Sequence, residues 1–489
     1  MTEVSLSRPA ATTEAELEIV LAAASAAAAP LGAFRPSERA AFLDAAADAL
    51  NAAAPELVPV GMRETHLPEA RLKGELKRTT FQLQLFAQVL RDGSYLDARI
   101  DHADPDWPMG APRPDLRRVL EPLGPVVVFA ASNFPFAFSV AGGDTASALA
   151  AGNPVVLKAH SGHPELSALT AAVLTGALTD AGAPQGTFAV VYGTAAGREA
   201  LTDPRVRAGS FTGSISGGRA LFDLAASRPE PIPFFGELGS NNPVFVTEAA
   251  AAERGADIAA AFVASFSAGA GQFCTKPGTF FVPAGSGLVE QLRAAALPAA
   301  APLLNQRIQD GYLEVFQELA GHPEIGTLVQ GQDPLTDPPS PTLLLTTAEQ
   351  MLTDPRSFQT ECFGPTALVV EYSSEAQLVP LAESFEGQLT ATVHGTDTCP
   401  VQELITVLAR KAGRVLWNDW PTGVSVTYAQ QHGGPYPATT ASGSTSVGTA
   451  AIGRFLRPVA YQGFPPHLLP EALQEANPLN LPRMVDGKR

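Results

Sequence analysis

Four strand-and-helix repeats between residues 126 and 227 constrain the fold of this chain more than any other feature of its sequence. In each repeat, a short apolar run typical of a buried strand is followed, after a brief turn, by a segment with helical spacing. The predicted strands are 126–130, 154–158, 188–191 and 209–211, and the predicted helices are 144–151, 164–181, 195–201 and 217–227. Such repeats predict a parallel, doubly wound α/β sheet, which binds ligands at the carboxyl ends of its strands.

Helices and a second set of alternating elements flank this sheet. Residues 13–92 are rich in alanine with helical spacing, and Pro36 marks a helix start after a break at residues 30–32. Prolines in the segment 231–233 indicate a hinge. The second set of elements begins with a strand at 242–246, a helix at 256–267 and a strand at 279–282. The Gly-, Ser- and Thr-rich stretch 433–453 is predicted to be an ordered loop that covers a site.

The bulk composition narrows the function classes. The 489 residues carry a net charge of −17 without a basic cluster, so we expect no nucleic-acid partner. The three separated cysteines predict no disulfide framework, and the eight histidines have no metal-site spacing. The uncharged run 123–143 contains two prolines and an asparagine, which favours a buried strand and loop over a membrane helix. With an acidic N-terminus unlike a signal peptide, these features predict a soluble, cytoplasmic protein without bound metal.

Cys274 is the strongest candidate for chemistry. It lies in the run GAGQFCTKPG at 269–278, among small residues that let a substrate carbon approach the sulfur. Glycines tolerate unusual backbone angles, and we expect Gly269 and Gly271 to leave room for ligands. A nucleophile is one interpretation of this pattern. The other interpretation is a buried cysteine that packs as a small hydrophobic residue.

Two further polar side chains lie at or just beyond predicted strand ends. Glu237 is an isolated acid in an apolar, glycine-flanked segment, where burial would raise its pKa towards that of a general base at neutral pH. Asn133 follows the strand at 126–130, and its side-chain amide can stabilise an oxyanion. Each has a structural alternative: a carboxylate satisfied by backbone amides for Glu237, and an Asx turn before Pro135 for Asn133.

The run FTGSISGG at 211–218 lies between a predicted strand and a predicted helix. Its glycines, Gly213 and Gly218, are five residues apart, unlike the usual dinucleotide fingerprint. Glycines nevertheless allow a backbone to approach a pyrophosphate, and a helix N-terminus offers it free N–H groups. A nucleotide site is one interpretation, and an ordinary Gly-Ser turn before a helix is the other.

Six motifs occur along the chain in a definite order. They are NFPF at 133–136, VVLK at 155–158, FTGS at 211–214, ELG at 237–239, GQFC at 271–274 and ECFGP at 361–365. Their order and spacing resemble the aldehyde dehydrogenase superfamily over almost the whole chain. The resemblance implies a Rossmann-type cofactor domain, an α/β catalytic domain and a small β oligomerisation flap. The implied ranges are 1–95 and 121–236 for the cofactor domain, 237–455 for the catalytic domain, and 96–120 with 456–489 for segments that bridge subunits of a homodimer or homotetramer.

The resemblance also implies roles for individual residues. Cys274 matches the catalytic thiol, Glu237 the general base and Asn133 the oxyanion-hole amide. The implied cofactor-binding residues, from the ribose lysine to the residues around the nicotinamide, are Lys158, His160, Ser161, Phe211, Thr212, Gly213, Ser214, Gly218, Leu238, Glu361 and Phe363.

The implied reaction is the oxidation of an aldehyde to a carboxylic acid. Cys274 as thiolate attacks the aldehyde carbon, while the Asn133 amide and the backbone N–H of Cys274 hold the oxyanion. Hydride leaves for the nicotinamide, a thioester remains, and Glu237 activates the water that releases the acid. The presence of both Cys274 and Glu237 speaks against a catalytically inactive relative, and Glu237 also speaks against transfer of the thioester to CoA.

One departure from the family pattern bears on cofactor choice. Family members that prefer NAD often carry a glutamate three residues after the ribose lysine, where it repels a 2′-phosphate. Here that position is Ser161, which can donate to a phosphate, and the neighbouring His160 adds charge when it is protonated. The sequence therefore predicts NADP, with NAD as the alternative.

The substrate prediction rests on a closer resemblance. The runs NFPFAFSVAGGD at 133–144, KAH at 158–160 and QHGGPYPAT at 431–439 resemble the α-ketoglutaric semialdehyde (2,5-dioxovalerate) dehydrogenase branch of the family. A sister group with similar motifs oxidises long-chain aldehydes, so a long-chain or general aldehyde is the alternative. A semialdehyde needs a cationic or N–H-rich anchor away from the sulfur. Arg454 is one candidate, and a structural salt bridge is its other interpretation.

Overall fold

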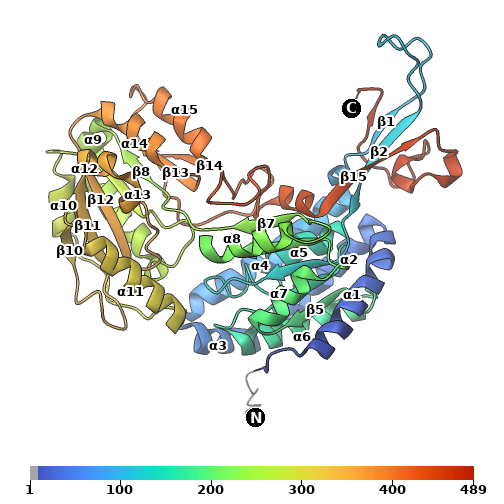
Figure 1. The fold of residues 1–489 in the computed structure, drawn as a ribbon, viewed down its shortest axis with the longest axis horizontal. Helices are drawn as coiled ribbons and strands as arrows, with labels where there is room; N and C mark the ends of the chain where they lie inside the picture. The colour runs from blue at the N-terminus through green and yellow to red at the C-terminus, as the bar shows by residue number, and fades with distance from the viewer. Residues whose placement is uncertain (1–8, 489) are drawn as a thin grey trace.

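The computed structural model describes residues 9–488. Two α/β domains lie side by side, and a small sheet projects from the edge of the first domain (Figure 1). The blue and green N-terminal half forms the first domain, and the yellow and orange segments form the second. The two domains are built around separate sheets. Of the catalytic candidates, Glu237 lies where the chain passes from the first domain to the second, Asn133 lies in the first domain and Cys274 in the second.

The first domain contains a five-stranded parallel sheet in the order β5–β4–β3–β6–β7. Its strands are β3 (Val126–Phe129), β4 (Val155–Lys158), β5 (Phe188–Val191), β6 (Ala208–Thr212) and β7 (Phe234–Glu237). The four predicted repeats supply the first four strands, so the predicted doubly wound sheet is confirmed. The strand order reverses between β3 and β6, and this topological switch brings the loop after β3 beside the turn after β6.

Helices cover both faces of this sheet. They are α1 (Glu14–Ala33), α2 (Pro36–Ala52), α3 (Ala54–Thr65), α4 (Glu69–Asp92), α5 (Gly143–Ala151), α6 (Pro164–Asp180), α7 (Thr194–Thr202) and α8 (Ile215–Ala226). Alternation along β3 explains the two layers, since Val126 and Val128 join the core under α2 and α4, while Val127 and Phe129 join the core under α1 and α7.

The helical N-terminal region is confirmed, with one correction. The helix α2 begins at Pro36 as predicted, but the break before it is not at residues 30–32. Instead, α1 continues through Pro30 to Ala33. A proline so near the helix end removes one intrahelical hydrogen bond without interrupting a long remainder.

Among residues 9–488, α1 is the one helix long and apolar enough, by length and composition, to span a membrane. Its buried face includes Leu17 and Leu21, which pack in the core of the first domain with β3 and β4. That packing is typical of a core helix. The uncharged run 123–143 forms β3 and a buried loop, as predicted.

The second domain contains a seven-stranded sheet in the order β10–β11–β12–β9–β8–β13–β14, parallel except for β10. Its strands are β8 (Val244–Val246), β9 (Thr279–Pro283), β10 (Gly326–Gln330), β11 (Thr342–Thr347), β12 (Thr366–Tyr372), β13 (Gln388–His394) and β14 (Ala412–Trp417). Its helices are α9 (Glu248–Ser267), α10 (Leu288–Ala294), α11 (Gln306–Ala320), α12 (Ala348–Thr353), α13 (Pro355–Phe358), α14 (Leu378–Ser384) and α15 (Gln402–Lys411).

The projecting sheet joins distant parts of the chain. Its strands are β1 (Arg99–Asp101), β2 (Leu116–Pro122), β15 (Leu456–Gln462) and β16 (Met484–Val485), in the order β15–β2–β1–β16. The predicted bridging segments 96–120 and 456–489 therefore form one sheet. Just before β15, residues 449–455 pack against α5, and Phe455 lies in the first-domain core. This end of the predicted range 237–455 thus belongs with the first domain.

Candidate active site

Cys274 lies on the loop that precedes β9, directly after a left-handed turn. Gly269, Ala270 and Gly271 have φ values of 57°, 55° and 70°. The buried side chain of Asn242 holds the backbone on both sides of Thr275, since its Nδ2 donates to the carbonyls of Cys274 at 2.8 Å and Lys276 at 2.9 Å. The unusual backbone expected of the glycines is present, and the thiol is half-buried.

The glycines of this loop make room for protein rather than for ligand, which corrects the expectation from the sequence. A Cβ atom at Gly271 would overlap the carbonyl of Gly364. A Cβ atom at Gly269 would come within 2.8 Å of the Phe273 ring. The absence of a side chain at Gly271 allows the loop that carries Glu361 to pack against the cysteine loop.

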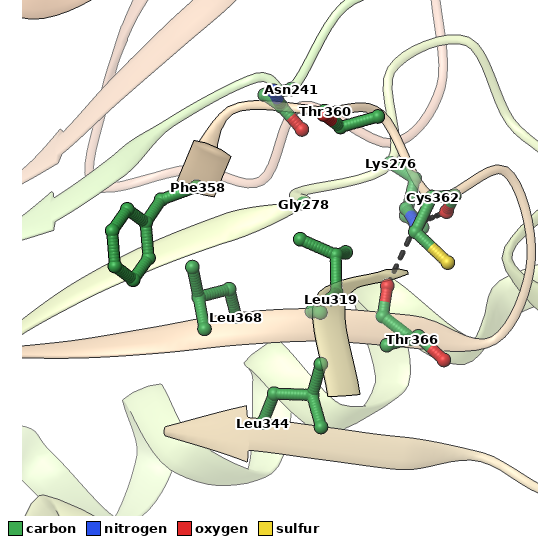
Figure 2. A pocket seen from close by; sticks show the side chains of 11 residues that line it. Asn241, Lys276, Gly278, Leu319, Leu344, Phe358, Thr360, Cys362, Thr366 and Leu368 are labelled. Atoms are coloured by element: carbon green, nitrogen blue, oxygen red, sulfur yellow. Dashed lines mark hydrogen bonds between the residues drawn. The ribbon is translucent and has the colours of Figure 1, made fainter. Parts of the chain in front are cut away.

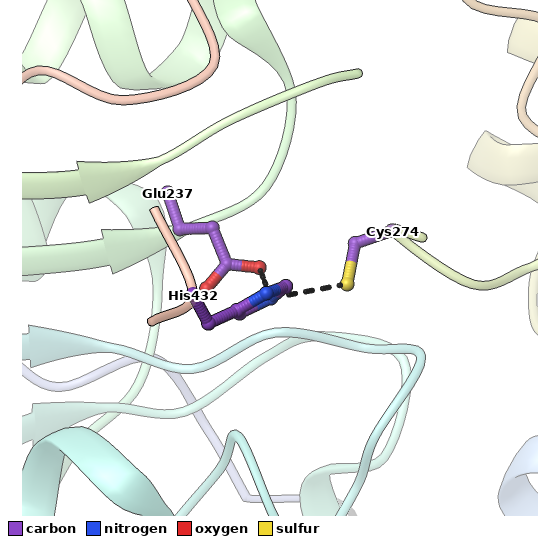
Figure 3. Close-up of side chains that lie close together, drawn as sticks. All are labelled: Glu237, Cys274 and His432. Atoms are coloured by element: carbon purple, nitrogen blue, oxygen red, sulfur yellow. Dashed lines mark hydrogen bonds and ion pairs between the residues drawn. The ribbon is translucent and has the colours of Figure 1, made fainter. Parts of the chain in front are cut away.

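Three side chains from distant parts of the chain meet at Cys274 (Figure 3). Glu237, at the end of β7, lies with its Oε1 atom 2.8 Å from Nε2 of His432. The same Nε2 lies 3.6 Å from Sγ of Cys274. Ser446 donates to Oε2 of Glu237. The ligand atoms of Glu237, Cys274 and His432 all lie within 4.8 Å of one another, a spacing that a metal ion can also bridge.

The contact with Glu237 identifies the ring nitrogen of His432 that acts as a donor. An ionised Glu237 oxygen at 2.8 Å from Nε2 requires a proton between the two atoms. The other ring nitrogen, Nδ1, is buried without a hydrogen-bond partner among the described residues. The His432 ring therefore donates to Glu237 through Nε2.

The site shifts the pKa values of the Glu237 carboxyl and the Cys274 thiol in opposite directions. Burial alone would raise the pKa of Glu237, but the charge and hydrogen bond of His432, with Ser446, outweigh it and lower that pKa. The raised pKa expected for Glu237 is therefore wrong, because the sequence did not reveal these donors. Burial and the adjacent Glu237 carboxylate raise the pKa of the Cys274 thiol well above its ordinary value.

Asn133 faces the cysteine loop. Its Nδ2 donates to the carbonyl of Gln272 at 3.1 Å, across 139 residues of sequence. The local Asx turn considered from the sequence therefore does not account for its side chain. Phe134, the next residue, packs edge-on against Phe273 with ring centroids 5.3 Å apart. The structure thus brings Asn133 and Cys274 to the same site, as required of the predicted oxyanion amide.

A buried lysine joins the cysteine loop to the loop of Glu361. Lys276 Nζ donates to the carbonyls of Cys362, Gly364 and Thr366, the last at 2.7 Å. Figure 2 shows Lys276 and Thr366 at the edge of a small cavity lined mainly by apolar side chains, Cys362 among them. Cys362 therefore packs in the second-domain core.

The Glu361 carboxylate lies directly against Gly239, two residues beyond Glu237. Burial raises the pKa of Glu361 to about 7, against the opposing charge of Lys276. Phe363 is half-buried on the same loop. Glu361 therefore lies beside the segment that carries Glu237, and the cofactor roles of Glu361 and Phe363 stay predictions.

The turn after β6 is built for close packing around an exposed helix start. Ser214 caps α8 by accepting from the Gly217 amide at 3.2 Å, and residues 213–216 are exposed. A Cβ at Gly213 would lie 2.6 Å from the Phe211 ring, while one at Gly218 would overlap Leu238. Gly218 thus serves helix packing rather than ligand approach. The free end of α8 fits a pyrophosphate, because its first N–H groups point away from the helix.

Lys158 ends β4 on the same side of the sheet, followed by the half-buried His160 and the exposed Ser161. Burial lowers the pKa of Lys158, and the positive charge of Arg307 lowers it further. Burial and the nearby His163 hold the pKa of His160 well below its ordinary value, and its Nδ1 accepts from Gly162 at 3.0 Å. His160 is therefore neutral at physiological pH, which corrects the expectation that it adds charge.

A model of the aldehyde dehydrogenase family matches residues 1–436. The chain belongs to the aldehyde dehydrogenase family. It is an NAD(P)-dependent enzyme that oxidises an aldehyde to a carboxylic acid, and its doubly wound domain and catalytic domain have the fold predicted from the motifs.

Relatives with assigned names support this membership. The enzyme is 47% identical over 459 residues to alpha-ketoglutaric semialdehyde dehydrogenase 2 of Azospirillum brasilense, covering 92% of this chain and 87% of that protein. It is 45% identical to alpha-ketoglutaric semialdehyde dehydrogenase of Acinetobacter baylyi, with the same coverage. The structure of a Thermus 1-pyrroline-5-carboxylate dehydrogenase with bound NAD matches with a TM-score of 0.76 and 20% identity, covering 93% of this chain and 86% of that one.

Arg454 does not reach the catalytic site of this aldehyde dehydrogenase. It is buried, its Nη2 lies 2.7 Å from Asp144, and its guanidinium lies 5.0 Å from the Phe455 ring centroid. The structural salt bridge considered from the sequence is therefore its role, and the carboxylate anchor proposed for it is wrong.

His432 is the site residue that sequence reasoning missed. It lies 158 residues from Cys274, and its run QHGGPYPAT served only to indicate the branch of the family. The stretch 433–453 wraps over the site as an ordered loop, as predicted, and Thr445 accepts from the His432 amide at 2.8 Å. A lone histidine before two glycines carried no local signal of this contact.

Proposed function

We propose that this aldehyde dehydrogenase oxidises α-ketoglutaric semialdehyde (2,5-dioxovalerate) to 2-oxoglutarate, with Cys274 as nucleophile and Glu237 as base. The observation that carries the chemistry is the meeting of Glu237, His432 and Cys274 within hydrogen-bonding range. The substrate follows from the names of two relatives that are 47% and 45% identical to the chain. A long-chain aldehyde is the alternative substrate.

Attack requires the Cys274 thiol to lose its proton. Because its pKa is raised, few thiolates exist in the free enzyme at neutral pH, so the proton is transferred as the sulfur approaches the aldehyde carbon. Glu237 is the ionised acceptor beside it, and His432 holds the carboxylate in place by donating through Nε2. The S–C bond forms as the thiol proton passes to the carboxylate.

The oxygen of the attacked aldehyde becomes negative and needs donors. We assign this role to the Asn133 amide and the backbone N–H of Cys274. A nicotinamide cofactor, when bound, would supply the acceptor for the hydride of the substrate carbon. Glu237 releases the thiol proton to solvent and then removes a proton from the water that attacks the Cys274 thioester. The S–C bond breaks, the acid leaves, and the Cys274 thiolate takes up this proton.

The residues present fit a dinucleotide. The exposed start of α8 at Ser214 suits the pyrophosphate, Lys158 the adenosine ribose, and Glu361 with Phe363 the nicotinamide end. We infer a preference for NADP. Ser161 offers a hydroxyl instead of a carboxylate, and Arg307 supplies the positive charge that His160 does not.

A substrate and cofactor panel tests this proposal. We expect kcat/KM for 2,5-dioxovalerate to exceed that for decanal, and NADP to exceed NAD, both read by absorbance of the reduced cofactor. Cys274→Ser should abolish turnover while retaining cofactor binding. A preference for decanal would contradict 2,5-dioxovalerate as the substrate. A strong preference for NAD would contradict the inferred preference for NADP.

We further propose a cytoplasmic homodimer or homotetramer. All three cysteines are unpaired, as suits a reducing compartment. In the projecting sheet, the connection between β1 and β2 exposes Trp107 and Met109, at 38% and 75%. Burying this connection against a second subunit would shield the two apolar side chains. Light scattering of the purified protein would test the oligomeric state.

A further inference from the structure

An arginine lies beside two phenylalanines, one next to Asn133 in the sequence and one next to Cys274. The guanidinium carbon of Arg71, on α4, lies 4.5 Å from the ring centroid of Phe134 and 4.5 Å from that of Phe273. Phe134 follows Asn133, and Phe273 precedes Cys274. The guanidinium therefore packs against one ring from the Asn133 loop and one from the Cys274 loop.

Arg71 is incompletely neutralised. Its Nε lies 3.6 Å from Oε2 of Glu75, while Oε1 of Glu75 accepts from the amides of Phe136 at 2.8 Å and Ala137 at 2.9 Å. Among residues 9–488, no other carboxylate forms an ion pair with Arg71 and its Nη atoms form no hydrogen bond. The Arg71 side chain is 22% exposed. It therefore keeps donors for an incoming anion, at a site where apolar rings exclude part of the solvent.

A second arginine lies seven residues further along the same face of α4. The guanidinium of Arg78 lies 5.5 Å from the Phe138 ring centroid, and its Nε donates to the Val424 carbonyl at 3.3 Å. Its Nη1 is buried without a hydrogen-bond partner among the described residues. A buried, unused guanidinium N–H is costly unless a ligand satisfies it.

We propose that Arg71 binds the carboxylate at the far end of the substrate, with Arg78 Nη1 as a second donor. The site takes an ω-oxo carboxylate: the aldehyde lies at Cys274, a short aliphatic spacer passes the aromatic rings, and the carboxylate pairs with Arg71. This inference rests on the semialdehyde function proposed above and supplies the anchor that Arg454 does not. A neutral aldehyde of equal length would enter without using the guanidinium.

The test compares 2,5-dioxovalerate with pentanal, a neutral aldehyde of the same carbon count, in the full-length enzyme. Arg71→Met should lower kcat/KM for 2,5-dioxovalerate by about 10–100-fold and leave that for pentanal within about threefold, because only the acid loses a charged hydrogen bond. Arg71→Lys, which keeps the charge but not the fork, should lie between. Lys73→Met removes an exposed cation of α4 and should leave kcat/KM unchanged for both substrates.

A binding measurement covers the case in which the Arg71 variants lose activity through misfolding. Glutarate should inhibit the wild type competitively with 2,5-dioxovalerate, and slow the alkylation of Cys274, but should do neither in a folded Arg71→Met enzyme. Equal losses for both aldehydes, or full retention of 2,5-dioxovalerate activity, would overturn the anchor alone. A wild type that oxidises pentanal or decanal but not 2,5-dioxovalerate would overturn the proposed substrate and the anchor together.

Discussion

His432 Nε2 lies 2.8 Å from Oε1 of Glu237, although 195 residues separate the two side chains in the sequence. The contact keeps the buried carboxylate ionised and directs it towards Cys274. It also explains why Glu237 has a lowered pKa in an environment that would otherwise raise it.

Replacing His432 should therefore alter the pH dependence of the reaction. Removal of the Nε2 donor leaves Glu237 with burial and the hydrogen bonds of Ser446 and Cys274, so the Glu237 pKa rises. Because the base acts when ionised, the acid limb of the kcat/KM profile of His432→Asn should move to higher pH, with kcat lowered by about 10–100-fold. Ser446→Ala should move the limb in the same direction by less. Profiles that coincide with wild type would exclude this role.

The reactivity of Cys274 should report the Glu237 charge. In the free enzyme, the rate of alkylation by iodoacetamide should still rise above pH 9, since the thiol pKa is raised well beyond its ordinary value. Glu237→Gln removes the adjacent negative charge, so the profile should shift to lower pH. Mass spectrometry resolves Cys274 from the half-buried Cys399, which serves as the internal control. An unshifted profile would contradict the electrostatic coupling.

Glu237→Gln should also separate the two halves of the reaction. Thioester hydrolysis needs a base for water, so steady-state turnover should fall by about 10²–10⁴-fold. A pre-steady-state burst of reduced cofactor should remain, because hydride leaves before hydrolysis, but it should rise more slowly, because attack by Cys274 loses its proton acceptor. Rapid-mixing absorbance measures both phases, with Cys274→Ala, which should show neither, as the control. Loss of the burst with normal steady-state turnover would reverse the assignment.

Cofactor affinity should depend on the ionisation of Glu361. Its pKa is about 7, so the carboxylate is mostly protonated at pH 6 and mostly ionised at pH 8. The ionised form is the stronger acceptor for ribose hydroxyls, and Kd for the cofactor should fall as pH rises through 7. Fluorescence titration of Glu361→Gln should show a weaker, pH-independent Kd over this range. The same slope in both proteins would place the titrating group elsewhere.

Lys276 should contribute to stability rather than to chemistry. Lys276→Met removes the donor for three buried carbonyls, and we expect a loss of about 1–3 kcal/mol in the free energy of unfolding, seen as a lower Tm. Lys77→Met, at an exposed position on α4, is the matched control and should leave Tm unchanged. An unchanged Tm in Lys276→Met would show that the two loops are held together by other contacts.

Much of the fold could be predicted because the relevant signals are local. Apolar runs followed by helical spacing identified β3 to β6 and their helices, and the proline at Pro36 identified the start of α2. The error at Pro30 has a local cause too, since the sequence does not state how near the helix end a proline lies. The path of the chain after 430, which returns to the first domain, had no local marker.

The candidate site likewise has a part that could be predicted from local sequence and a part that could not. Residue type and motif order pointed to Cys274, Glu237 and Asn133 from the chain alone. The thiol, carboxylate and amide that the reaction needs are set by residue type, which the sequence states directly. Their proton affinities and neighbours depended on contacts across the fold. Packing sets the distances between residues far apart in sequence, and such distances leave no periodic pattern in the chain. Four findings depend on them: the pairing of His432 with Glu237, the neutral state of His160, the burial of Arg454 and the position of Arg71.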